Sequence, residues 1–483
     1  MSAITVPEAP ERSSGDRPPL SAHTAASLLG RQVARPPVRL VHLGLGAFHR
    51  SHQLWHTALV DEGGEWGYAA FTGRSPSAAR TLEAQDGLYA IATRGVDGDR
   101  VDLISSLVEA HDGADVDRLA ELLRSPAVAV VTLTITEAGY RLGADGDLDP
   151  EDPDTAADLD ALAQTGFVAG DAAPPLRTAL GRLVFALAAR RDAGAGPITI
   201  LPCDNMPANG AVVARAVGAI AEAASPDLAR WVRANVAFAS SVVDRITPAT
   251  TEDDIRSLAE RIGVTDRGLV VTEPFSEWII AGEFPAGRPE WERSGARIVA
   301  DVEPYERRKL WMLNGAHTVL AITARSFGHT TVADAIADPR VREWVEEYWD
   351  VATERLSAPE LAIGPYRDAL VERFSNARIA HHLDQIAAET TTKLRYRIVP
   401  LLVRARGDGR MPNGCVRPIA AWVRSLRAGR RDVDAFGPRI DEALAAPAPD
   451  VTSSLLGILD PALRKDDALI AEVDAYVALS IPA

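Results

Sequence analysis

Cysteine is scarce in this chain of 483 residues, which contains only Cys203 and Cys415. Two cysteines provide neither a disulfide framework nor the ligand quartet of a structural zinc site. The sequence also has no run of about 18 uninterrupted apolar residues, so no membrane-spanning helix is expected. The first 20 residues are rich in proline, serine and charge, and they lack the apolar core of a signal peptide. These absences predict a cytoplasmic protein without a bound metal.

Positive charge is also in short supply, because 51 Lys and Arg residues face 67 Asp and Glu residues and leave a formal net charge of −16. Such a chain is not expected to bind nucleic acid or an anionic membrane surface. A local basic pocket can still hold a small anionic ligand. The chain is 47% apolar and too long for one compact core, so two domains are expected.

The segment VRLVHLGLGAFHRSHQ has the pattern of a strand, a glycine turn and a helix. Val38–Leu43 is the apolar strand, the turn contains Gly44 and Gly46, and helical spacing begins near Phe48. Backbone N–H groups at such a helix start attract a pyrophosphate, so the segment predicts a dinucleotide site. The usual third glycine is replaced by His49 followed by Arg50, and a simple tight turn is the alternative interpretation.

A second group of polar residues stands in KLWMLNGAH, where Lys309, Asn314 and His317 are close in sequence. On an α-helix their separations correspond to rotations of about 140°, 80° and 300°, a wide arc that can still face one cavity. Lysine exchanges a proton, asparagine polarises an oxygen and histidine orients a hydroxyl. The group therefore predicts proton transfer at an alcohol or carbonyl, without a nucleophile or a metal.

Together these two segments resemble the polyol-specific long-chain dehydrogenases, typified by mannitol 2-dehydrogenase and fructuronate reductase. That family carries G-x-G-x-F-H-R-x-H-Q near its N-terminus and K-x4-N-G-x-H in its second half. Further similar stretches are TLTITEAGY (Thr132–Tyr140), LPCDNMPANG (Leu201–Gly210), VVDRITP (Val242–Pro248) and RFSN (Arg373–Asn376). The resemblance spans roughly residues 38 to 400 in the same order.

Strands and helices alternate through the first half of the sequence. Ala127–Thr136 is apolar on both faces, which is typical of a strand in a parallel sheet covered on each side. Val101–Glu109 is expected to form another strand. From about Tyr305 the apolar residues follow helical spacing, beginning with an expected helix at Tyr305–Phe327.

We therefore predict an α/β protein with an N-terminal Rossmann-type doubly wound domain and a mostly α-helical C-terminal domain. The expected divisions are a flexible N-terminal extension at residues 1–35, the dinucleotide-binding domain at 36–295 and the substrate and catalytic domain at 296–483.

Polar residues follow several of the apolar runs, notably Thr136, Asn205 and Asp244. Ligands of open α/β sheets bind beyond the carboxyl ends of strands, so these residues are expected to line one crevice. Lys309 is expected to face that crevice as the base in alcohol oxidation and the acid in reduction. Burial and the positive charge of neighbouring arginines would lower its pKa.

The resemblance implies the same role for Lys309, and oxyanion-stabilising roles for Asn205 and Asn314. It also favours contact of His317 with a substrate hydroxyl. The alternatives are a turn cap at Asn205, a helix break at Asn314 and an ordinary core histidine at His317. Glu306 would relay protons to solvent, or would simply be a carboxylate on a helix surface.

Two more basic residues are expected to bind substrate. Arg373 lies in the RFSN stretch, and Lys393 falls where the family commonly has K-[LI]-P. The proline is replaced here by Arg395. The extra charge of Arg395 and Arg397 would favour a substrate carboxylate, as in fructuronate. The alternative is an exposed basic helix start.

The resemblance implies NAD as the cofactor. Thr72-Gly73-Arg74-Ser75 provides no acid at the expected end of the second strand, where NAD enzymes usually hold the ribose hydroxyls, so NADP stays open. The predicted cofactor-binding residues are Gly44, Gly46, Phe48, His49, Arg50, Arg74, Thr136 and Asp244.

The predicted protein is a metal-independent oxidoreductase that transfers hydride between NAD(P) and a polyol or sugar acid. Mannitol with fructose and mannonate with fructuronate are the leading pairs. One alternative is a catalytically silent NAD-binding sensor, and another is a 6-phosphogluconate-type dehydrogenase, which the FHRSHQ and CDN motifs do not suit. A monomer or a small homo-oligomer is expected.

Overall fold

The structure is a computed structural model, which describes residues 3–5, 17–165, 173–379 and 381–479. The chain forms two compact units, Met1–Glu303 and Pro304–Ala483. Residues 1–2 and 6–16 of the predicted N-terminal extension lie outside the described part. The described part of the extension contains helix α1 (Ala22–Leu29), which begins with a capping box between Ser21 and Thr24.

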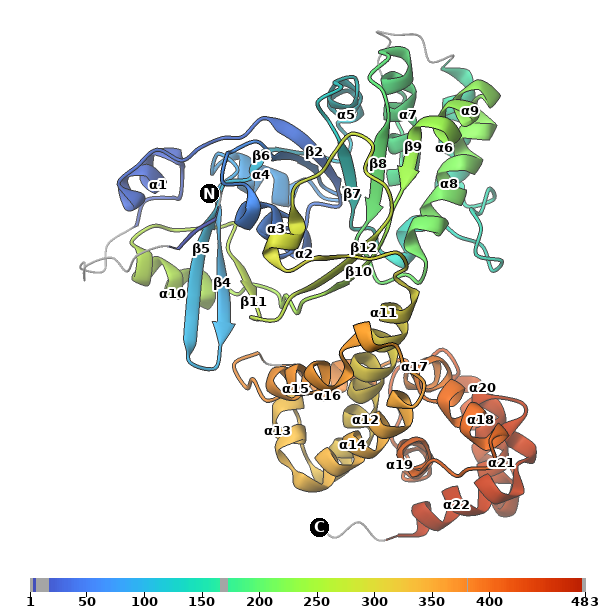
Figure 1. Cartoon of the computed structure of the whole chain (residues 1–483). Helices are drawn as coiled ribbons and strands as arrows, with labels where there is room; N and C mark the ends of the chain where they lie inside the picture. Colours follow the sequence, from blue (N-terminus) through green and yellow to red (C-terminus); the bar gives the residue numbers. More distant parts are fainter. Residues whose placement is uncertain (1–2, 6–16, 166–172, 380, 480–483) are drawn as a thin grey trace. The chain divides into compact units, whose positions relative to one another are not determined.

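The first unit is built around a six-stranded parallel sheet with the strand order β6-β3-β2-β7-β8-β9 (Figure 1). Its strands are β2 (Val38–Leu43), β3 (Gly67–Phe71), β6 (Leu107–His111), β7 (Val130–Leu133), β8 (Ile198–Pro202) and β9 (Val236–Phe238). Leu40 and Val41 are both fully buried but belong to different hydrophobic clusters, because successive side chains of a strand point to opposite faces.

Helices cover both faces of this sheet. One face packs against α5 (Val116–Leu123), α7 (Ala179–Asp192), α8 (Asn209–Ala224) and α9 (Pro226–Asn235), with α6 (Pro153–Gln164) against α7 and α8. The other face packs against α3 (Gln53–Val60), α4 (Ser77–Glu83) and the short helix η2 (Trp291–Ser294). The short helix α2 (Ala47–Ser51) directly precedes α3. This arrangement confirms the predicted doubly wound fold.

Two smaller sheets complete the first unit. One has the order β1-β5-β4-β11, and the other has the order β10-β12-β13. Their strands are β1 (Ala3–Thr5), β4 (Tyr89–Gly95), β5 (Gly98–Ile104), β10 (Ser240–Asp244), β11 (Val270–Thr272), β12 (Glu277–Ala281) and β13 (Arg297–Ile298). Helix α10 (Glu252–Ile262) joins α1 in a separate cluster on the first of these sheets.

The prediction of a single strand at Val101–Glu109 is wrong. The segment contributes to β5, which pairs with β4, and to β6, which pairs with β3 in the central sheet. The chain changes sheets at the buried pair Ser105 and Ser106, where the Ser106 hydroxyl donates to the Leu54 carbonyl at 3.2 Å. The stretch VDLISSLV, which runs from β5 into β6, has no proline or glycine to mark the change of sheet.

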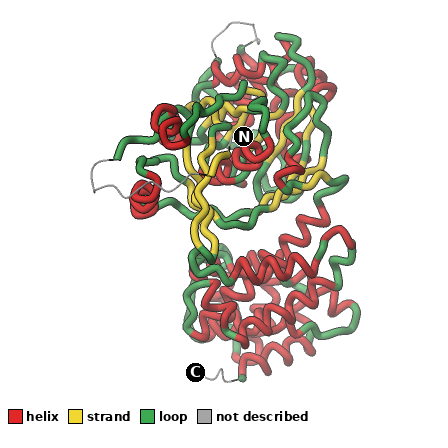
Figure 2. Tube along the Cα trace, turned by 60° about the vertical axis from the view of Figure 1, so that its left-hand side comes forward, coloured by secondary structure: helices red, strands yellow, loops and turns green. Residues whose placement is uncertain are grey.

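The second unit is helical (Figure 2). Its α-helices are α11 (Glu303–Arg308), α12 (Ala316–Thr323), α13 (Val332–Ala337), α14 (Pro339–Thr353), α15 (Ile363–Phe374), α16 (Leu383–Ala387), α17 (Thr390–Arg397), α18 (Val399–Gly407), α19 (Asn413–Arg427), α20 (Gly437–Leu444), α21 (Val451–Leu459) and α22 (Asp467–Ala478). The 3-10 segments are η4 (Ala324–Phe327), η5 (Pro359–Leu361), η6 (Ala448–Asp450) and η7 (Leu463–Lys465). Within the described ranges, no helix is long and apolar enough to cross a membrane.

The helix predicted at Tyr305–Phe327 is present but irregular. Its middle is a π-helix, η3 (Lys309–Gly315), which lies between α11 and α12. Helix α12 packs against α14, α16 and α19 and is buried along its whole length. Lys309 and Asn314 therefore lie on the π segment, and His317 lies on the buried helix α12 that follows it.

Three buried histidines in the first unit are held neutral. His42 and His49 are fully buried, with rings stacked at a centroid distance of 3.3 Å, and His56 is 1% exposed. Burial lowers the pKa of His42 to about 3 and lowers the pKa values of His49 and His56 well below 6.5. In the folded state these three histidines therefore stay unprotonated below about pH 6.5, where the histidines of the unfolded chain bind protons.

We expect the free energy of unfolding to fall as the pH drops from 7.5 to 5.5. Each of these histidines contributes up to about 1.4 kcal/mol per pH unit below about pH 6.5, because the unfolded state binds more protons. Urea unfolding at both pH values measures the slope. His42→Gln should reduce the slope, whereas the matched change at the exposed His23 should leave it unchanged. An unaltered slope in His42→Gln would contradict this account.

Candidate active site

A glycine turn connects β2 to α2 in the first unit. Gly44 has a φ of +112°, and a Cβ atom at this position would overlap the carbonyl oxygen of Thr134. Only glycine combines this backbone conformation with so close an approach of two chain segments. The N–H groups of Gly44 and Leu45 both donate to the Phe71 carbonyl at 2.8 Å, which ties the turn to the end of β3.

A cavity of about 430 Å³ lies at the carboxyl ends of β2, β3 and β7. It is lined by Leu43, Gly44, Phe71, Thr72, Gly73, Arg74, Gly113, Thr134, Ile135, Thr136, Gly139, Arg141, Arg177, Thr178, Ala179 and Arg182. Ligands of open α/β sheets bind at this edge. The cavity therefore contains three of the residues predicted to bind cofactor, namely Gly44, Arg74 and Thr136.

The other predicted cofactor residues do not line this cavity. His49 is buried, with Nδ1 3.4 Å from Gln53 Oε1, and Phe48 stacks on His52 at 5.0 Å. Arg50 donates to the carbonyl oxygens of Gly46 and Gly268. In this structure the FHR motif stabilises the turn and its surroundings, and ligand contact by its residues stays a prediction. Gly46 is the N-cap of α2, and Asp244, 7% exposed, ends β10.

The loop that carries Asn205 is held by residues on both sides of it. The Tyr140 hydroxyl, at the end of η1 (Glu137–Tyr140), donates to the Asp204 carboxylate. The buried Asn209 side chain accepts from the Ser241 N–H at 3.0 Å and donates to the Ser241 carbonyl at 2.9 Å. Burial raises the pKa of Asp204. Asn205 is exposed on a loop that is anchored to η1 and to β10.

The anchoring residues were not identified as functional from the sequence. Tyr140 belongs to TEAGY, and Asp204 and Asn209 belong to LPCDNMPANG, so the motifs contain the signal. Motif matching does not tell which residue contacts a ligand and which holds the loop. The tertiary hydrogen bonds make that distinction.

The π-helical segment determines the angle between the Lys309 and Asn314 side chains around the helix axis in the second unit. In a π-helix the backbone hydrogen bond spans five residues, so side chains five apart lie close to one face. Lys309 and Asn314 have this spacing. An α-helix would separate them by about 140° around the axis. Both side chains are half-buried, and His317 follows three residues after Asn314 in regular α-helix.

Side chains from neighbouring helices supply donors to the π segment. Arg397 Nη1 and the Thr318 hydroxyl each donate to the Asn314 carbonyl at 3.0 Å, and Trp349 Nε1 donates to the Met312 carbonyl at 2.7 Å. These side-chain donors add to the backbone hydrogen bonds of the π segment.

Gly315 lets helix α14 approach this segment. A Cβ atom at position 315 would overlap the Tyr348 hydroxyl group, so no larger residue fits without displacement. The Tyr348 hydroxyl in turn donates to the Arg397 carbonyl at 3.0 Å. Gly315, Tyr348 and Arg397 therefore fix the π segment from one side.

His317 lies in a buried and positively charged environment. It is 9% exposed, and its ring lies 4.8 Å from Phe374 and 4.9 Å from His381. Burial and nearby His381, Arg373, Arg397 and Lys393 lower its pKa well below 6.5, so the ring is neutral. Its Nε2 atom has no hydrogen-bond partner among the described residues. A ligand hydroxyl would satisfy this atom.

The remaining predicted residues of the second unit are placed as follows. Arg373 is 8% exposed at the end of α15, and Glu306 is half-buried on α11. Lys393 Nζ donates to the carbonyls of Ile386 and Ala388, each at 2.7 Å. The Arg395 guanidinium stacks over Phe436 at 4.9 Å. The contacts of Arg395 and Arg397 are thus intramolecular.

Potential metal ligands are dispersed. In the portion of the chain that the structure describes, no three His, Cys, Asp or Glu side chains form a group able to hold a metal ion. Cys203 and Cys415 are both buried, and burial raises the pKa of each thiol.

A Rossmann-type unit with a glycine turn and a strand-end cavity, followed by a helical unit with an aligned lysine and asparagine, defines a two-domain oxidoreductase. The mannitol dehydrogenase Rossmann domain family matches residues 38–293, and the mannitol dehydrogenase C-terminal domain family matches residues 301–444. The chain belongs to the mannitol dehydrogenase family.

Several characterised relatives are similar along most of their length. D-mannonate oxidoreductase of Escherichia coli (strain K12) is 35% identical over 414 residues, which cover 83% of this chain and 82% of the relative. Mannitol 2-dehydrogenase of Cereibacter sphaeroides is 36% identical over 400 residues, 80% of each chain. The relatives thus include both a sugar-acid and a polyol enzyme.

Solved structures are similar over almost the whole chain. The ternary complex of Pseudomonas fluorescens mannitol 2-dehydrogenase with NAD and D-mannitol has a TM-score of 0.74 and 30% identity, covering 97% of this chain and 94% of that chain. A substrate-free D-sorbitol dehydrogenase has a TM-score of 0.81 and 27% identity, covering 95% and 96%.

We expect Gly315→Ala to destabilise the second unit by about 1–3 kcal/mol, because the added methyl group overlaps the Tyr348 hydroxyl. Gly364→Ala is the matched control. Gly364 also lies in a helix of this unit, and nothing lies within 4 Å of the place that its added methyl group would take. The control should be neutral or stabilising by up to about 1 kcal/mol. Urea unfolding measures both, and equal effects would refute the packing argument.

Proposed function

We propose that this chain catalyses the reversible oxidation of a secondary alcohol in a polyol or sugar acid, with NAD as the hydride acceptor and NADP left open. The observation that carries the proposal is the π-helical alignment of Lys309 and Asn314 beside the neutral, buried His317. A base, an oxyanion donor and a hydroxyl-binding group are the protein groups that alcohol oxidation requires.

Lys309 is the proposed base. The chain has three lysines, Lys309, Lys393 and Lys465, among its 51 basic residues, so arginine carries nearly all of its positive charge. An arginine keeps its proton at any pH an enzyme meets, whereas a lysine can release one. A lysine in the π segment of such an arginine-rich chain therefore supports a role in proton transfer rather than in surface charge.

Asn314 and His317 complete the proposed catalytic face. The Asn314 carbonyl is held by Arg397 and Thr318, which fixes the backbone from which its amide side chain projects as a donor to the developing oxyanion. His317 Nε2 is proposed to accept or donate a hydrogen bond with a substrate hydroxyl. Asn205 is proposed as a second oxyanion donor, and Glu306 as a proton relay to solvent.

The first unit fits a dinucleotide cofactor. The strand-end cavity supplies the space, and it is lined by the polar side chains of Arg74 and Thr136. Gly44 also lines it, at a place where a side chain would collide with the Thr134 backbone. Bound NAD would supply the hydride acceptor at its nicotinamide ring. The D-mannonate, mannitol and arabinitol relatives support this reaction class.

Positive charge around His317 favours an anionic substrate among the family alternatives. Arg373, Lys393 and Arg397 all act on the His317 ring electrostatically. Arg397 donates to the Asn314 carbonyl, and Lys393 donates to two backbone carbonyls. Arg373 is the proposed partner of a sugar-acid carboxylate because its RFSN stretch resembles a substrate-binding segment of the family and because its charge acts on the His317 ring.

The proposal is tested by initial rates of NADH and NADPH oxidation with fructose, fructuronate, tagaturonate and xylulose. We expect reduction of at least one of these ketoses, with the uronates favoured by the charge around His317. Turnover of a uronate but not of fructose would support the sugar-acid assignment. Dinucleotide binding without turnover across a wider panel would instead indicate a non-catalytic dinucleotide sensor, and CO2 release would indicate a decarboxylating dehydrogenase.

Lys309→Arg tests the base directly, because it keeps the charge but removes the ability to accept a proton. We expect kcat to fall by about 10²- to 10⁴-fold while NADH binding is retained. Lys465→Arg, at an exposed lysine of η7, is the matched control and should keep full activity. Undiminished turnover in Lys309→Arg would remove Lys309 from the mechanism.

A further inference from the structure

The end of strand β3 lacks the acidic residue that commonly binds an adenosine ribose. In dinucleotide-binding folds, an Asp or Glu after the second strand accepts hydrogen bonds from the ribose hydroxyls of NAD, whereas an arginine there accommodates the 2′-phosphate of NADP. Here β3 ends at Phe71 and continues through Thr72 and Gly73 to Arg74, and all four residues line the cavity.

A second arginine reaches the same strand end from another element. Arg182 is the fourth residue of α7, and its Nη1 atom lies 3.0 Å from the position a Cβ atom would take on Gly113. The same position is 2.9 Å from the Gly73 carbonyl oxygen. Arg182 therefore stands beside the backbone that precedes Arg74, and both side chains line one cavity.

Gly113 keeps this place open. A side chain at position 113 would overlap the Thr72 carbonyl oxygen and press against Arg182. The Gly113 N–H donates to the Thr72 hydroxyl at 3.0 Å, which holds the ends of β3 and β6 together. The absence of a side chain here leaves room between the two strand ends and the Arg182 guanidinium.

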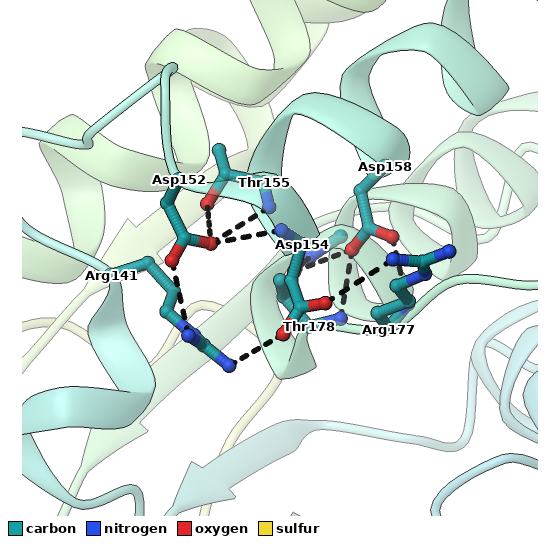
Figure 3. Close-up of polar contacts among 8 residues, drawn as sticks. Arg141, Asp152, Asp154, Thr155, Asp158, Arg177 and Thr178 are labelled. Atoms are coloured by element: carbon teal, nitrogen blue, oxygen red, sulfur yellow. Dashed lines mark hydrogen bonds and ion pairs between the residues drawn. The ribbon is translucent and has the colours of Figure 1, made fainter.

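Two other arginines at the cavity are already neutralised. Arg141 pairs with Asp152 at 3.1 Å and with Asp154 at 2.7 Å, and Arg177 pairs with Asp154 at 3.4 Å (Figure 3). These carboxylates compensate Arg141 and Arg177. They leave Arg74 and Arg182 as the cavity arginines whose charge is available to a ligand.

Neither Arg74 nor Arg182 forms an ion pair with any residue that the structure describes. The acidic groups that face Arg182 are Asp112 and Asp158. The Asp158 carboxylate accepts from the N–H groups of residues 177 and 178 and from the Thr178 hydroxyl, as Figure 3 shows. The Asp112 carboxylate accepts from the N–H of Ala114. These acidic groups are thus engaged at backbone turns.

We propose that Arg74 and Arg182 bind a phosphate on the adenosine 2′-oxygen, so that this chain accepts NADP(H) as well as NAD(H). The planar guanidinium groups provide paired donors that match phosphate oxygens. No acidic residue stands between the end of β3 and Arg74, where an Asp or Glu would bind the ribose hydroxyls of NAD. The inference rests on the proposed dinucleotide-dependent function, and it names the form of the cofactor that the cavity takes.

Binding of NADH and NADPH to the full-length protein, measured by nucleotide fluorescence without substrate, tests this inference. We expect the wild-type Kd for NADPH to lie within about tenfold of that for NADH. Arg74→Ala and Arg182→Met should each weaken NADPH binding by about tenfold or more and change NADH binding by less than about threefold. Arg74→Glu should abolish NADPH binding and retain NADH binding.

Arg80→Ala is the matched control, because Arg80 is an exposed arginine of α4 that does not line the cavity. It should leave both affinities unchanged. Displacement of NADPH by adenosine 2′,5′-bisphosphate, but much less by AMP, would assign the effect to the 2′-phosphate.

Two results would overturn the inference. One is a wild-type Kd for NADPH more than about a hundredfold above that for NADH. The other is an equal loss of affinity for NADH and NADPH in Arg74→Ala and Arg182→Met. That result would mean that the arginines bind the pyrophosphate or attract either nucleotide by their positive charge alone. Because binding is measured without substrate, a result in which NADPH binding depends on the two arginines stands even if no ketose is reduced. Failure of the proposed reaction is thus distinguishable from failure of this inference.

Discussion

The hydrogen bond from Arg397 to the Asn314 carbonyl supports the feature on which the candidate catalytic face depends. A π-helical segment is an unfavourable interruption of an α-helix, and it persists only where its surroundings supply the missing contacts. Burial lowers the pKa of Arg397 to about 10, because removing the guanidinium from water disfavours its charged form. That cost is offset by the Asn314 carbonyl and the Thr318 hydroxyl, and by the Tyr348 contact at its backbone.

In the first unit, too, the candidate site depends on contacts between segments that are distant in sequence. Its binding edge is made by close approach of backbone segments, and glycine is required where a side chain would collide, as at Gly44 and Gly113. Beneath this edge, fully buried polar groups such as His42 hydrogen-bond to Thr132 and Thr134 on the neighbouring strand end. Satisfied polar contacts hold the cavity open while apolar clusters on both faces hold the sheet.

Much of the site could be predicted from the sequence. Gly44, Arg74 and Thr136, which were each predicted to bind cofactor, line one cavity, because residues after parallel strands meet at one edge of the sheet. Of Thr136, Asn205 and Asp244, which were expected to line one crevice, only Thr136 lines this cavity. Lys309, Asn314 and His317 lie on one helix as expected. The expected ligand contacts of His49 and Arg50 differ from their buried, intramolecular contacts here. A sequence motif alone does not tell whether a residue such as His49 contacts a ligand or stabilises the fold.

The sequence by itself determined the alternation of strands and helices, the doubly wound fold and the identity of the reactive groups, because these follow from periodicity and side-chain chemistry. Only the tertiary structure placed Lys309 and Asn314 on a π segment, whose wider turn brings residues five apart closer together around the axis than an α-helix does. Local propensity favours an uninterrupted α-helix, whereas Trp349 and Arg397, distant in sequence, donate hydrogen bonds to carbonyls of the π segment. The position of Arg74 and Arg182 at one cavity was likewise decided by packing, because only the folded sheet brings α7 close to the end of β3.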